Sequence, residues 1–341
     1  AGGSAASAKF DLGIVFEEEL SGFPSLERFG TTLREEVLDR ARTEFDGVIL
    51  GTQSHMDYPA VVDGGRNVSA GFRIGLDLYA NVRPARSRDF LANKAPGMDL
   101  VIMREATEGF YPDRNMYKGV GEMMPGPDMA LSVRKITRRG SMRICREAFK
   151  LARQRRKKVA AIHKANSFLM TDGLFLECFR EVAKDYPDVE TEELIVDAFA
   201  ALLVRQPHVY DVVVATNFYG DILSDLASEL SGSLGLAGSI NANAETGHCC
   251  AQAQHGSAPD IAGKNVANPT SLILSAAMML TWLGEQRGED RVMAAGHAIS
   301  NAVDDVIHDP ANRTRDIGGT VNTDAFGNLV AERLSRMSLA A

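Results

Sequence analysis

The stretch DVVVATNFYGDILSD, residues 211–225, is most informative about the fold, because a strand pattern passes here directly into a helix pattern. The apolar run 211–215 is typical of a buried strand, and a helix is predicted to begin near Gly220. Asp221 and Asp225 are four residues apart, so both carboxylates would lie on one face of that helix. Two interpretations stay open. Either one aspartate helps to cap the helix while the other faces water, or the pair binds a divalent cation.

The same alternation of strand and helix patterns extends over most of the chain. Strands are predicted at 13–19, 47–51, 76–82, 99–103, 159–163 and 211–216, and helices at 33–43, 141–154, 174–186, 196–206 and from 270 onward. Such alternation indicates an α/β protein with a mostly parallel sheet. The first ten residues are predicted to be a flexible segment or loop, and residues 112–130, rich in Gly, Pro and Met, to be an arm.

The composition of the chain narrows the class of ligand. With 341 residues, 45% of them hydrophobic, the chain can form one large or two medium domains. A net charge of −8 argues against a nucleic-acid groove and suits a protein with small-molecule ligands.

No apolar stretch reaches the roughly 20 residues that span a membrane. Four irregularly spaced cysteines imply no disulfide framework, which indicates a reducing compartment and a cytoplasmic location.

Several polar residues follow predicted strands, where α/β proteins place their binding sites. Arg73, Arg83 and Arg104 flank or follow strand patterns, and three guanidinium groups in one crevice would suit a di- or tricarboxylate. Each arginine alone could also be an ordinary surface residue. Lys164 directly follows a strand, where it is either solvated or, in a closed cleft, a proton acceptor. The Gly-rich phosphate loops G-x-G-x-x-G and G-x-x-x-x-G-K-[ST] are missing, so a nucleotide site would be built differently.

Four motifs, taken in order, resemble the β-decarboxylating dehydrogenases, the family of isocitrate, 3-isopropylmalate and homoisocitrate dehydrogenases. They are HKAN (163–166), the Asp-Ala pair at 197–198, NFYGDILSD (217–225) and HGSAPDIAGKNVANP (255–269). The resemblance runs from about residue 30 to the C-terminus. The stretches LDLYANVRPARSR (76–88) and REATEGFY (104–111) are most similar to the homoisocitrate and NAD-dependent isocitrate branches.

This resemblance implies an isopropylmalate-dehydrogenase-like fold of two domains, with a mixed, mostly parallel sheet and an NAD site that is not of the Rossmann type. The larger domain is expected to comprise residues 1–95 and 245–341 and to bind the cofactor. The smaller domain, 96–244, is expected to supply a homodimer interface, with the arm at 112–130 clasping the second copy. The active site would be shared between the two subunits.

The resemblance also assigns a role to each site residue. Arg73, Arg83 and Arg104 would bind the 2-hydroxy acid. Asp221 and Asp225 of one subunit, with Asp197 of the other, would hold Mg²⁺ or Mn²⁺. Lys164, also reaching across the dimer interface, would accept the C2 hydroxyl proton as hydride passes to NAD, and Tyr111 would protonate C3 after CO2 is lost.

The NAD site would come from residues 255–269. The resemblance places His255, Gly256, Ser257 and Ala258 along the adenosine and phosphates, and Asn268 at the adenine edge. Asp260 would accept both ribose hydroxyl protons of NAD and repel the 2′-phosphate of NADP. The sequence therefore predicts an NAD-dependent enzyme.

Two departures from the family pattern stand out. A strand and a Gly-rich turn normally precede the strand predicted at 13–19. Either the natural first residues are missing from this sequence, which is our expectation, or the sheet has lost a strand. Gln252 stands where relatives carry a glutamate.

The substituent on the substrate stays open. Ser69 or Asn67 could bind a distal carboxylate, Ala70 and Phe72 an alkyl group, and Arg66 a longer acid. Tartrate and D-malate are further candidates, and a non-catalytic regulatory subunit is the alternative to an enzyme.

Overall fold

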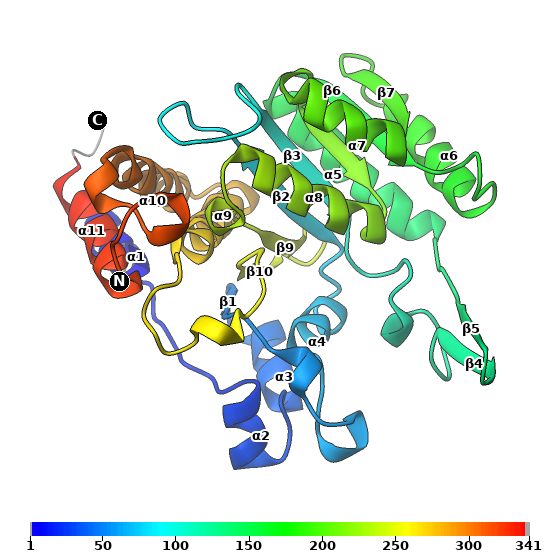
Figure 1. Ribbon diagram of the computed structural model, residues 1–341, viewed down its shortest axis with the longest axis horizontal. Helices are drawn as coiled ribbons and strands as arrows, with labels where there is room; N and C mark the ends of the chain where they lie inside the picture. The colour runs from blue at the N-terminus through cyan, green and yellow to red at the C-terminus, as the bar shows by residue number, and fades with distance from the viewer. Residues whose placement is uncertain (1, 338–341) are drawn as a thin grey trace. The chain divides into compact units, whose positions relative to one another are not determined.

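The computed structural model describes residues 2–337, which form two compact units (Figure 1). The first unit comprises residues 2–76, 90–92 and 233–337, and the second comprises residues 77–89 and 93–232. Residue 1 and residues 338–341, which the predicted larger domain includes, lie outside the described residues.

A twisted sheet with helices on both faces forms the second unit. Its strands, in spatial order, are β2 (Ala80–Arg86), β3 (Asp99–Glu105), β8 (Val212–Ala215), β6 (Lys158–His163) and β7 (Glu190–Ile195). Its helices are α5 (Arg138–Gln154), α6 (Thr171–Ala183), α7 (Val196–Arg205) and α8 (Asn217–Ser231). Strands β2 and β3 are antiparallel, whereas β3, β8, β6 and β7 run parallel to one another.

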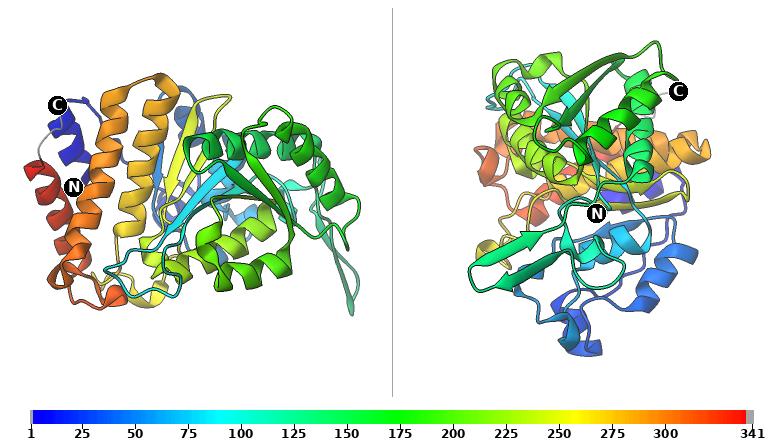
Figure 2. Two further views of the ribbon diagram at one scale, coloured as in Figure 1. Left: turned by 90° about the horizontal axis from the view of Figure 1, so that it is seen from above. Right: turned by 90° about the vertical axis from the view of Figure 1, so that its right-hand side faces the viewer.

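The apolar runs of β3, β6 and β8 are buried on both faces, which explains why they lack a polar alternation. Val212 and Val214 pack on one side with residues of α5 and α6, such as Phe149 and Phe179. Val213 and Ala215 pack on the other side with residues of α7 and α8. Successive side chains of a strand point to opposite faces, so one short run serves both cores. The two helix pairs accordingly cover opposite faces of the sheet (Figure 2).

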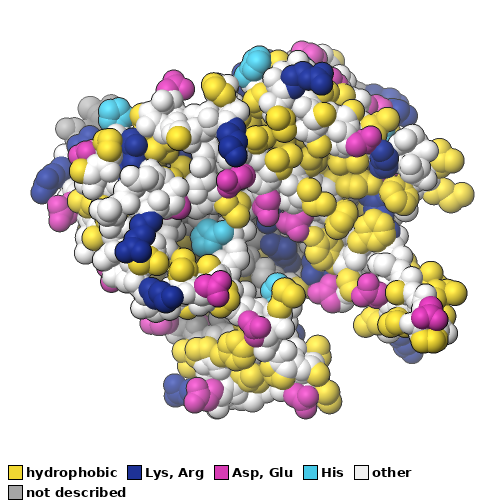
Figure 3. Space-filling view, in the orientation of Figure 1, with side chains coloured by type: hydrophobic (Ala, Val, Ile, Leu, Met, Phe, Trp, Pro, Cys, Tyr) yellow, Lys and Arg dark blue, Asp and Glu magenta, His cyan; other side chains and the backbone are white. Residues whose placement is uncertain are grey.

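An antiparallel hairpin extends from the second unit (Figure 1). It consists of β4 (Glu122–Gly126) and β5 (Met129–Ser132) and overlaps most of the C-terminal half of the segment predicted to be an arm, 112–130. Met123, Met124, Met129 and Leu131 are all exposed on it. The space-filling view shows these apolar side chains gathered on the projection at the lower right (Figure 3). The hairpin therefore presents an apolar surface to its surroundings.

The first unit combines a few strands with a group of long helices. Its strands are β1 (Val48–Leu50), β10 (His248–Gln252) and β9 (Ile240–Asn243), with β1 parallel and β9 antiparallel to β10. Its helices are α1 (Gly2–Phe10), α2 (Phe23–Phe29), α3 (Glu35–Thr43), α4 (Val68–Gly75), α9 (Thr270–Arg287), α10 (Asp290–His308) and α11 (Thr323–Arg336). Helices α9 and α10 run side by side (Figure 2). Gly296 permits this close packing, because a Cβ there would lie 2.5 Å from the Ala277 carbonyl oxygen.

The structure confirms the predicted α/β class and the mixed, mostly parallel sheet. Three local predictions are wrong. Residues 2–10 form a helix rather than a flexible segment, because Ala6 is buried among α9, α10 and α11. Residues 13–19 form no strand, and within residues 2–337 they pair with none. The strand predicted at 76–82 begins later, at Ala80, after a left-handed turn at Asp77 (φ 49°).

Strands β7, β9 and β10 were not predicted. Among residues 2–337, no helix is both long enough and apolar enough to cross a membrane.

Candidate active site

Two arginines from neighbouring strands of the second unit form the base of the site. Arg83 lies on β2 and Arg104 on β3, and only 6% and 2% of their side chains are exposed. A buried guanidinium group is costly unless acceptors surround it. Helix α8 supplies most of these acceptors.

Helix α8 approaches β3 closely because of Gly220. A Cβ at that position would lie 2.7 Å from the Cβ of Arg104, so a larger residue would push the helix away. Asn217, in the first turn of α8, accepts hydrogen bonds from Nε (2.9 Å) and Nη2 (2.6 Å) of Arg104 through its Oδ1. Its Nδ2 donates to the carbonyl oxygen of Glu108 at 2.8 Å. Asn217 therefore fixes the arginine against the helix.

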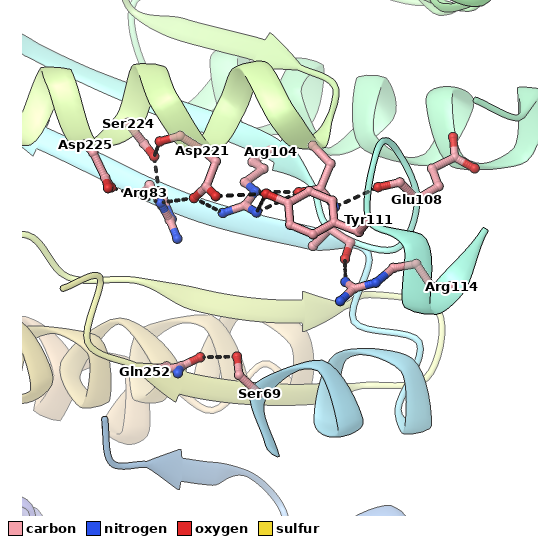
Figure 4. Close-up of polar contacts among 12 residues, drawn as sticks. Ser69, Arg83, Arg104, Glu108, Tyr111, Arg114, Asp221, Ser224, Asp225 and Gln252 are labelled. Carbon is pink, nitrogen blue, oxygen red and sulfur yellow. Dashed lines mark hydrogen bonds and ion pairs between the residues drawn. The ribbon is translucent and has the colours of Figure 1, made fainter. Parts of the chain in front are cut away.

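The two aspartates of the quoted stretch face these arginines (Figure 4). Arg83 Nη1 donates to Asp221 Oδ1 (3.1 Å), Asp225 Oδ1 (3.2 Å) and Ser224 Oγ (2.7 Å). Arg104 Nη1 also contacts Asp221 Oδ1. The spacing of four residues thus places both carboxylates on one helix face, as predicted, and that face is turned toward buried cations.

Tyr111 completes the cluster. Its hydroxyl accepts a hydrogen bond from Arg104 Nη2 at 2.9 Å and donates one to Asp221 Oδ2 at 2.8 Å. The guanidinium group of Arg104 lies 5.7 Å from the centre of the Tyr111 ring. The hydroxyl hydrogen is therefore held beside a carboxylate, and a cation lies next to the oxygen that would be left after proton donation.

Charge is closely balanced in this cluster. Burial, together with the nearby charge of Arg104, lowers the pKa of Arg83 to about 10, and Asp221 and Asp225 partly oppose this change. The two buried cations are compensated by two carboxylates that are partly exposed, and such pairing is the condition under which buried charges are tolerated.

The donor set fits a hard divalent cation. Asp221 is half-buried and 52% of the Asp225 side chain is exposed, so carboxylate oxygens can be reached from solvent. Such oxygens are the ligands that Mg²⁺ and Mn²⁺ prefer. Among residues 2–337, however, no three His, Cys, Asp or Glu side chains are grouped closely enough to hold a metal. One chain thus presents a pair of candidate ligands rather than a full set.

Lys164 and Asp197 form a separate pair. Lys164 Nζ lies 2.5 Å from Asp197 Oδ1, and this bond lowers the pKa of Asp197. Lys164 follows β6, and Asp197 lies in the first turn of α7. The structure therefore brings these two predicted residues together, but in one chain Asp197 does not join Asp221 and Asp225 in a metal-binding group.

The remaining predicted substrate residues lie in the first unit. Ser69 and Arg73 are on α4, whose N-terminus is capped by Asn67 through a 3.0 Å bond from the Ala70 N–H. Ser69 Oγ donates to Gln252 Oε1 at 2.8 Å (Figure 4). The residue that departs from the family pattern is thus a direct partner of a predicted substrate residue.

The predicted cofactor segment 255–269 is mostly exposed. His255 and Ser257 are half-buried, whereas Gly256, Ala258 and Asp260 are exposed. Ala258 has a left-handed backbone (φ 46°) immediately before a short 3₁₀ turn, Pro259–Ile261.

Asn268 differs from the rest of this segment because it is buried. Its Nδ2 donates to Asp316 at 2.9 Å, and its Oδ1 accepts from the Thr270 N–H at 3.0 Å. Both ends of this amide are therefore engaged within the chain.

Sequence reasoning missed several partners in the cluster. Asn217 and Ser224 lie within the quoted motif, but only the structure shows that they bind Arg104 and Arg83. The sequence did contain a usable signal. A buried arginine requires several hydrogen-bond acceptors, and the neutral side chains next to the aspartates in this motif could have been proposed as acceptors.

Comparisons with known proteins show the family and the fold to which the chain belongs. The family model described as isocitrate/isopropylmalate dehydrogenase matches residues 4–330. An isocitrate/homoisocitrate dehydrogenase of Thermus thermophilus is 42% identical over 96% of this chain and 91% of that protein. The mitochondrial NAD isocitrate dehydrogenase catalytic subunit 5 of Arabidopsis thaliana is 42% identical over 94% of this chain and 81% of its own length. The crystal structure of isocitrate dehydrogenase from Methylococcus capsulatus superposes with a TM-score of 0.84 at 38% identity, covering 98% and 95% of the two chains.

These findings confirm the family resemblance, the assignment to the oxidoreductases that act on a CH–OH group, and the cofactors expected from the sequence, since the family uses NAD with Mg²⁺ or Mn²⁺. The chain belongs to the isocitrate/isopropylmalate dehydrogenase family of NAD-dependent decarboxylating hydroxyacid dehydrogenases.

Proposed function

We propose that this chain catalyses the NAD- and metal-dependent oxidative decarboxylation of a 3-substituted malate to the 2-oxo acid and CO2. The single observation that carries the proposal is the cluster of Arg83, Arg104, Tyr111, Asp221 and Asp225. It combines cations for a polycarboxylate, carboxylates for a metal and a phenol that can donate a proton.

Each group has a role that its surroundings support. Arg83 and Arg104 would bind and orient the carboxylates of the substrate, because a buried guanidinium group can donate two parallel hydrogen bonds. When bound, Mg²⁺ or Mn²⁺ would lower the pKa of the C2 hydroxyl and neutralise charge on the oxygen during decarboxylation. NAD, when bound, would accept the hydride from C2, and Tyr111 would donate a proton to C3 after CO2 has left that carbon. Arg104, 2.9 Å from the phenol oxygen, would stabilise the negative charge left on Tyr111.

We further propose that the enzyme is a homodimer that shares each active site. In one chain Lys164 and Asp197 form their own pair apart from a metal-binding group. The partner subunit's Lys164 would then accept the C2 hydroxyl proton, and the partner subunit's Asp197 would complete the metal ligands. Exposed apolar side chains lie near both sets of proposed ligands. Leu169 and Met170 follow Lys164 in the chain, and Ile222 lies on α8 beside Asp221. A second copy of the chain would bury such side chains.

The roles of Arg73 and Ser69 in substrate binding, and of residues 255–260 and Asn268 in NAD binding, remain part of the same proposal. Asp260 is the residue that would favour NAD over NADP. The buried, unpaired state of Cys145, Cys178, Cys249 and Cys250 is compatible with the cytoplasm, where we expect the enzyme to act.

The test is NADH formation, followed at 340 nm, from a panel of isocitrate, homoisocitrate, 3-isopropylmalate, D-malate and tartrate. Each acid is supplied with NAD or NADP and with Mn²⁺ or Mg²⁺. We expect metal-dependent turnover of one acid with NAD, and loss of this turnover in Asp225→Asn. The control is Asp305→Asn, which alters an exposed ion pair with Arg333 on α10 and α11. If the folded protein forms no NADH from any acid of the panel, the result would instead favour a regulatory subunit.

A further inference from the structure

A buried carboxylate outside the cluster holds the backbone of Lys164. Asp172, in the first turn of α6, is 0% exposed. Its Oδ2 accepts a hydrogen bond from the Lys164 N–H at 2.5 Å. Its other oxygen, Oδ1, accepts from Arg134 Nη1. A fully buried carboxylate requires such partners, and here one of them is the residue proposed to accept the substrate proton.

Arg134 is itself enclosed. Only 5% of its side chain is exposed, and its guanidinium group lies between 5.0 and 5.4 Å from the ring centres of Phe110, Phe168 and Tyr219. Aromatic faces attract a cation but cannot accept its full set of hydrogen bonds. Asp172 is therefore the charge that compensates Arg134 inside this aromatic enclosure.

The same guanidinium group also reaches α8. Arg134 Nη2 donates to Thr216 Oγ1 at 3.0 Å, and Thr216 is the residue directly before that helix. This hydroxyl makes no capping bond to the helix backbone, so its bond from Arg134 is the contact that ties it to the rest of the unit. One planar, forked cation thus joins the segment that begins at Lys164 to the start of the helix that carries Asp221 and Asp225.

We propose that Arg134 and Asp172 are positioning residues that hold the Lys164 backbone and the start of helix α8 in place. In the proposed dimer Lys164 serves the partner's active site and α8 serves the chain's own. Neither side chain needs to touch substrate for this role. The inference rests on the proposed function, because Lys164 has a proton to accept only in that reaction. A misplacement of about 1 Å at a catalytic group is sufficient to lower a rate by about 100-fold.

Three variants test the proposal. Asp172→Asn leaves Arg134 without its countercharge, whereas Arg134→Lys keeps the charge but loses the fork that spans Asp172 and Thr216. Thr216→Val keeps the shape and removes one acceptor only. The matched control is Glu181→Gln, which alters an exposed ion pair with Arg138 at the other end of α6.

We expect kcat to fall about 100-fold in Asp172→Asn, about 10-fold in Arg134→Lys and a few-fold in Thr216→Val, with the control unchanged. The KM for NAD and the dissociation constant of NADH, whose proposed site lies outside α6 and α8, should each stay within about twofold of the wild type. Such a split separates positioning of a proton acceptor from a general loss of structure, which would weaken all ligands together.

Two outcomes would overturn the inference: kcat values equal to the control in all three variants, or a parallel rise of every KM and dissociation constant. Lys164→Met is measured beside them. If it retains full activity, the proposed role of Lys164 is what has failed. If it is inactive while the three variants match the control, only the positioning proposal has failed. Should Asp172→Asn not fold, Arg134→Lys and Thr216→Val decide the question by the same criteria.

Discussion

The stability of the second unit should depend on pH through Glu108. This residue is 4% exposed, and its carboxylate accepts hydrogen bonds from the Thr137 N–H (2.8 Å) and the Thr137 hydroxyl (2.7 Å) at the start of α5. Burial, followed by the nearby charge of Glu105, raises the pKa of Glu108 from 4.5 to about 7, and the bonds from Thr137 only partly oppose this change.

The sign of the effect follows from the raised pKa. The folded state binds the proton more tightly than the unfolded chain does, so the contribution of Glu108 to stability is fully present below about pH 4.5. It is lost as the pH rises through about 7. Since each pKa unit corresponds to 1.36 kcal/mol, the full loss is about 3 kcal/mol, most of which falls between pH 5 and 8.

The substitution Glu108→Gln tests this reasoning, because the amide keeps the shape and an acceptor oxygen but has no titrating proton. We expect the free energy of unfolding of the variant, relative to the wild type, to rise by about 2–3 kcal/mol between pH 5 and pH 8. Urea denaturation followed by far-UV circular dichroism measures this difference. Glu122→Gln, an exposed change on β4, is the control. If the difference between variant and wild type stays constant from pH 5 to 8, Glu108 does not titrate in this range and the argument is refuted.

Three further predictions concern the site. Arg104→Lys should lower kcat/KM about 100-fold, because a lysine cannot reach all the acceptors that the guanidinium group bridges; steady-state NADH formation measures this, and a loss under fivefold would contradict it. Asp225→Asn should weaken Mn²⁺ binding about 10-fold or more in calorimetric titration, whereas Asp305→Asn should leave it unchanged. Asp260→Ala should raise the ratio of kcat/KM for NADP over NAD several-fold, since removal of a like charge near the 2′-phosphate is worth about 1 kcal/mol. An unchanged ratio would show that Asp260 does not select the cofactor.

The fold was predictable where a segment is buried on both sides. Strands β3, β6 and β8 have apolar runs that only a central position in a sheet explains. Strand β7, ETEELI, was missed because it lies at the edge of the sheet and carries charged residues, which edge strands use to prevent further pairing. Residues 13–19 show the opposite error. Their β-branched and aromatic residues suggested a strand, but a strand exists only where another strand accepts its hydrogen bonds.

The sequence predicted which residues belong to the site much better than it predicted the hydrogen-bond partners of those residues. The spacing of Asp221 and Asp225 placed them on one helix face, and their position after a strand placed them at the edge where sites form. No spacing rule shows that Arg134 and Asp172, 38 residues apart, form a buried ion pair that binds the backbone N–H of Lys164. Such pairs depend on how α6, β6 and the segment after the hairpin pack together, and single-sequence periodicity contains no information about that packing.

The paired aspartates raised a problem of charge that the structure resolves without a ligand. Two carboxylates on one helix face repel each other, but Arg83 and Arg104 lie within hydrogen-bonding distance and compensate them. The same arginines would be costly to bury alone. The aspartates therefore offset the cost of burying the arginines, and the arginines offset the repulsion between the aspartates. A ligand that brings only an anion would compete with the aspartates for the arginines, and one that brings only a cation would compete with the arginines for the aspartates. A metal together with a polycarboxylate supplies both charges at once. The aspartates would then bind the metal in place of the arginines, and the arginines would bind the carboxylates of the acid in place of the aspartates. The self-neutralised cluster is therefore matched to joint binding of the metal and the acid, which is the combination that the proposed reaction requires.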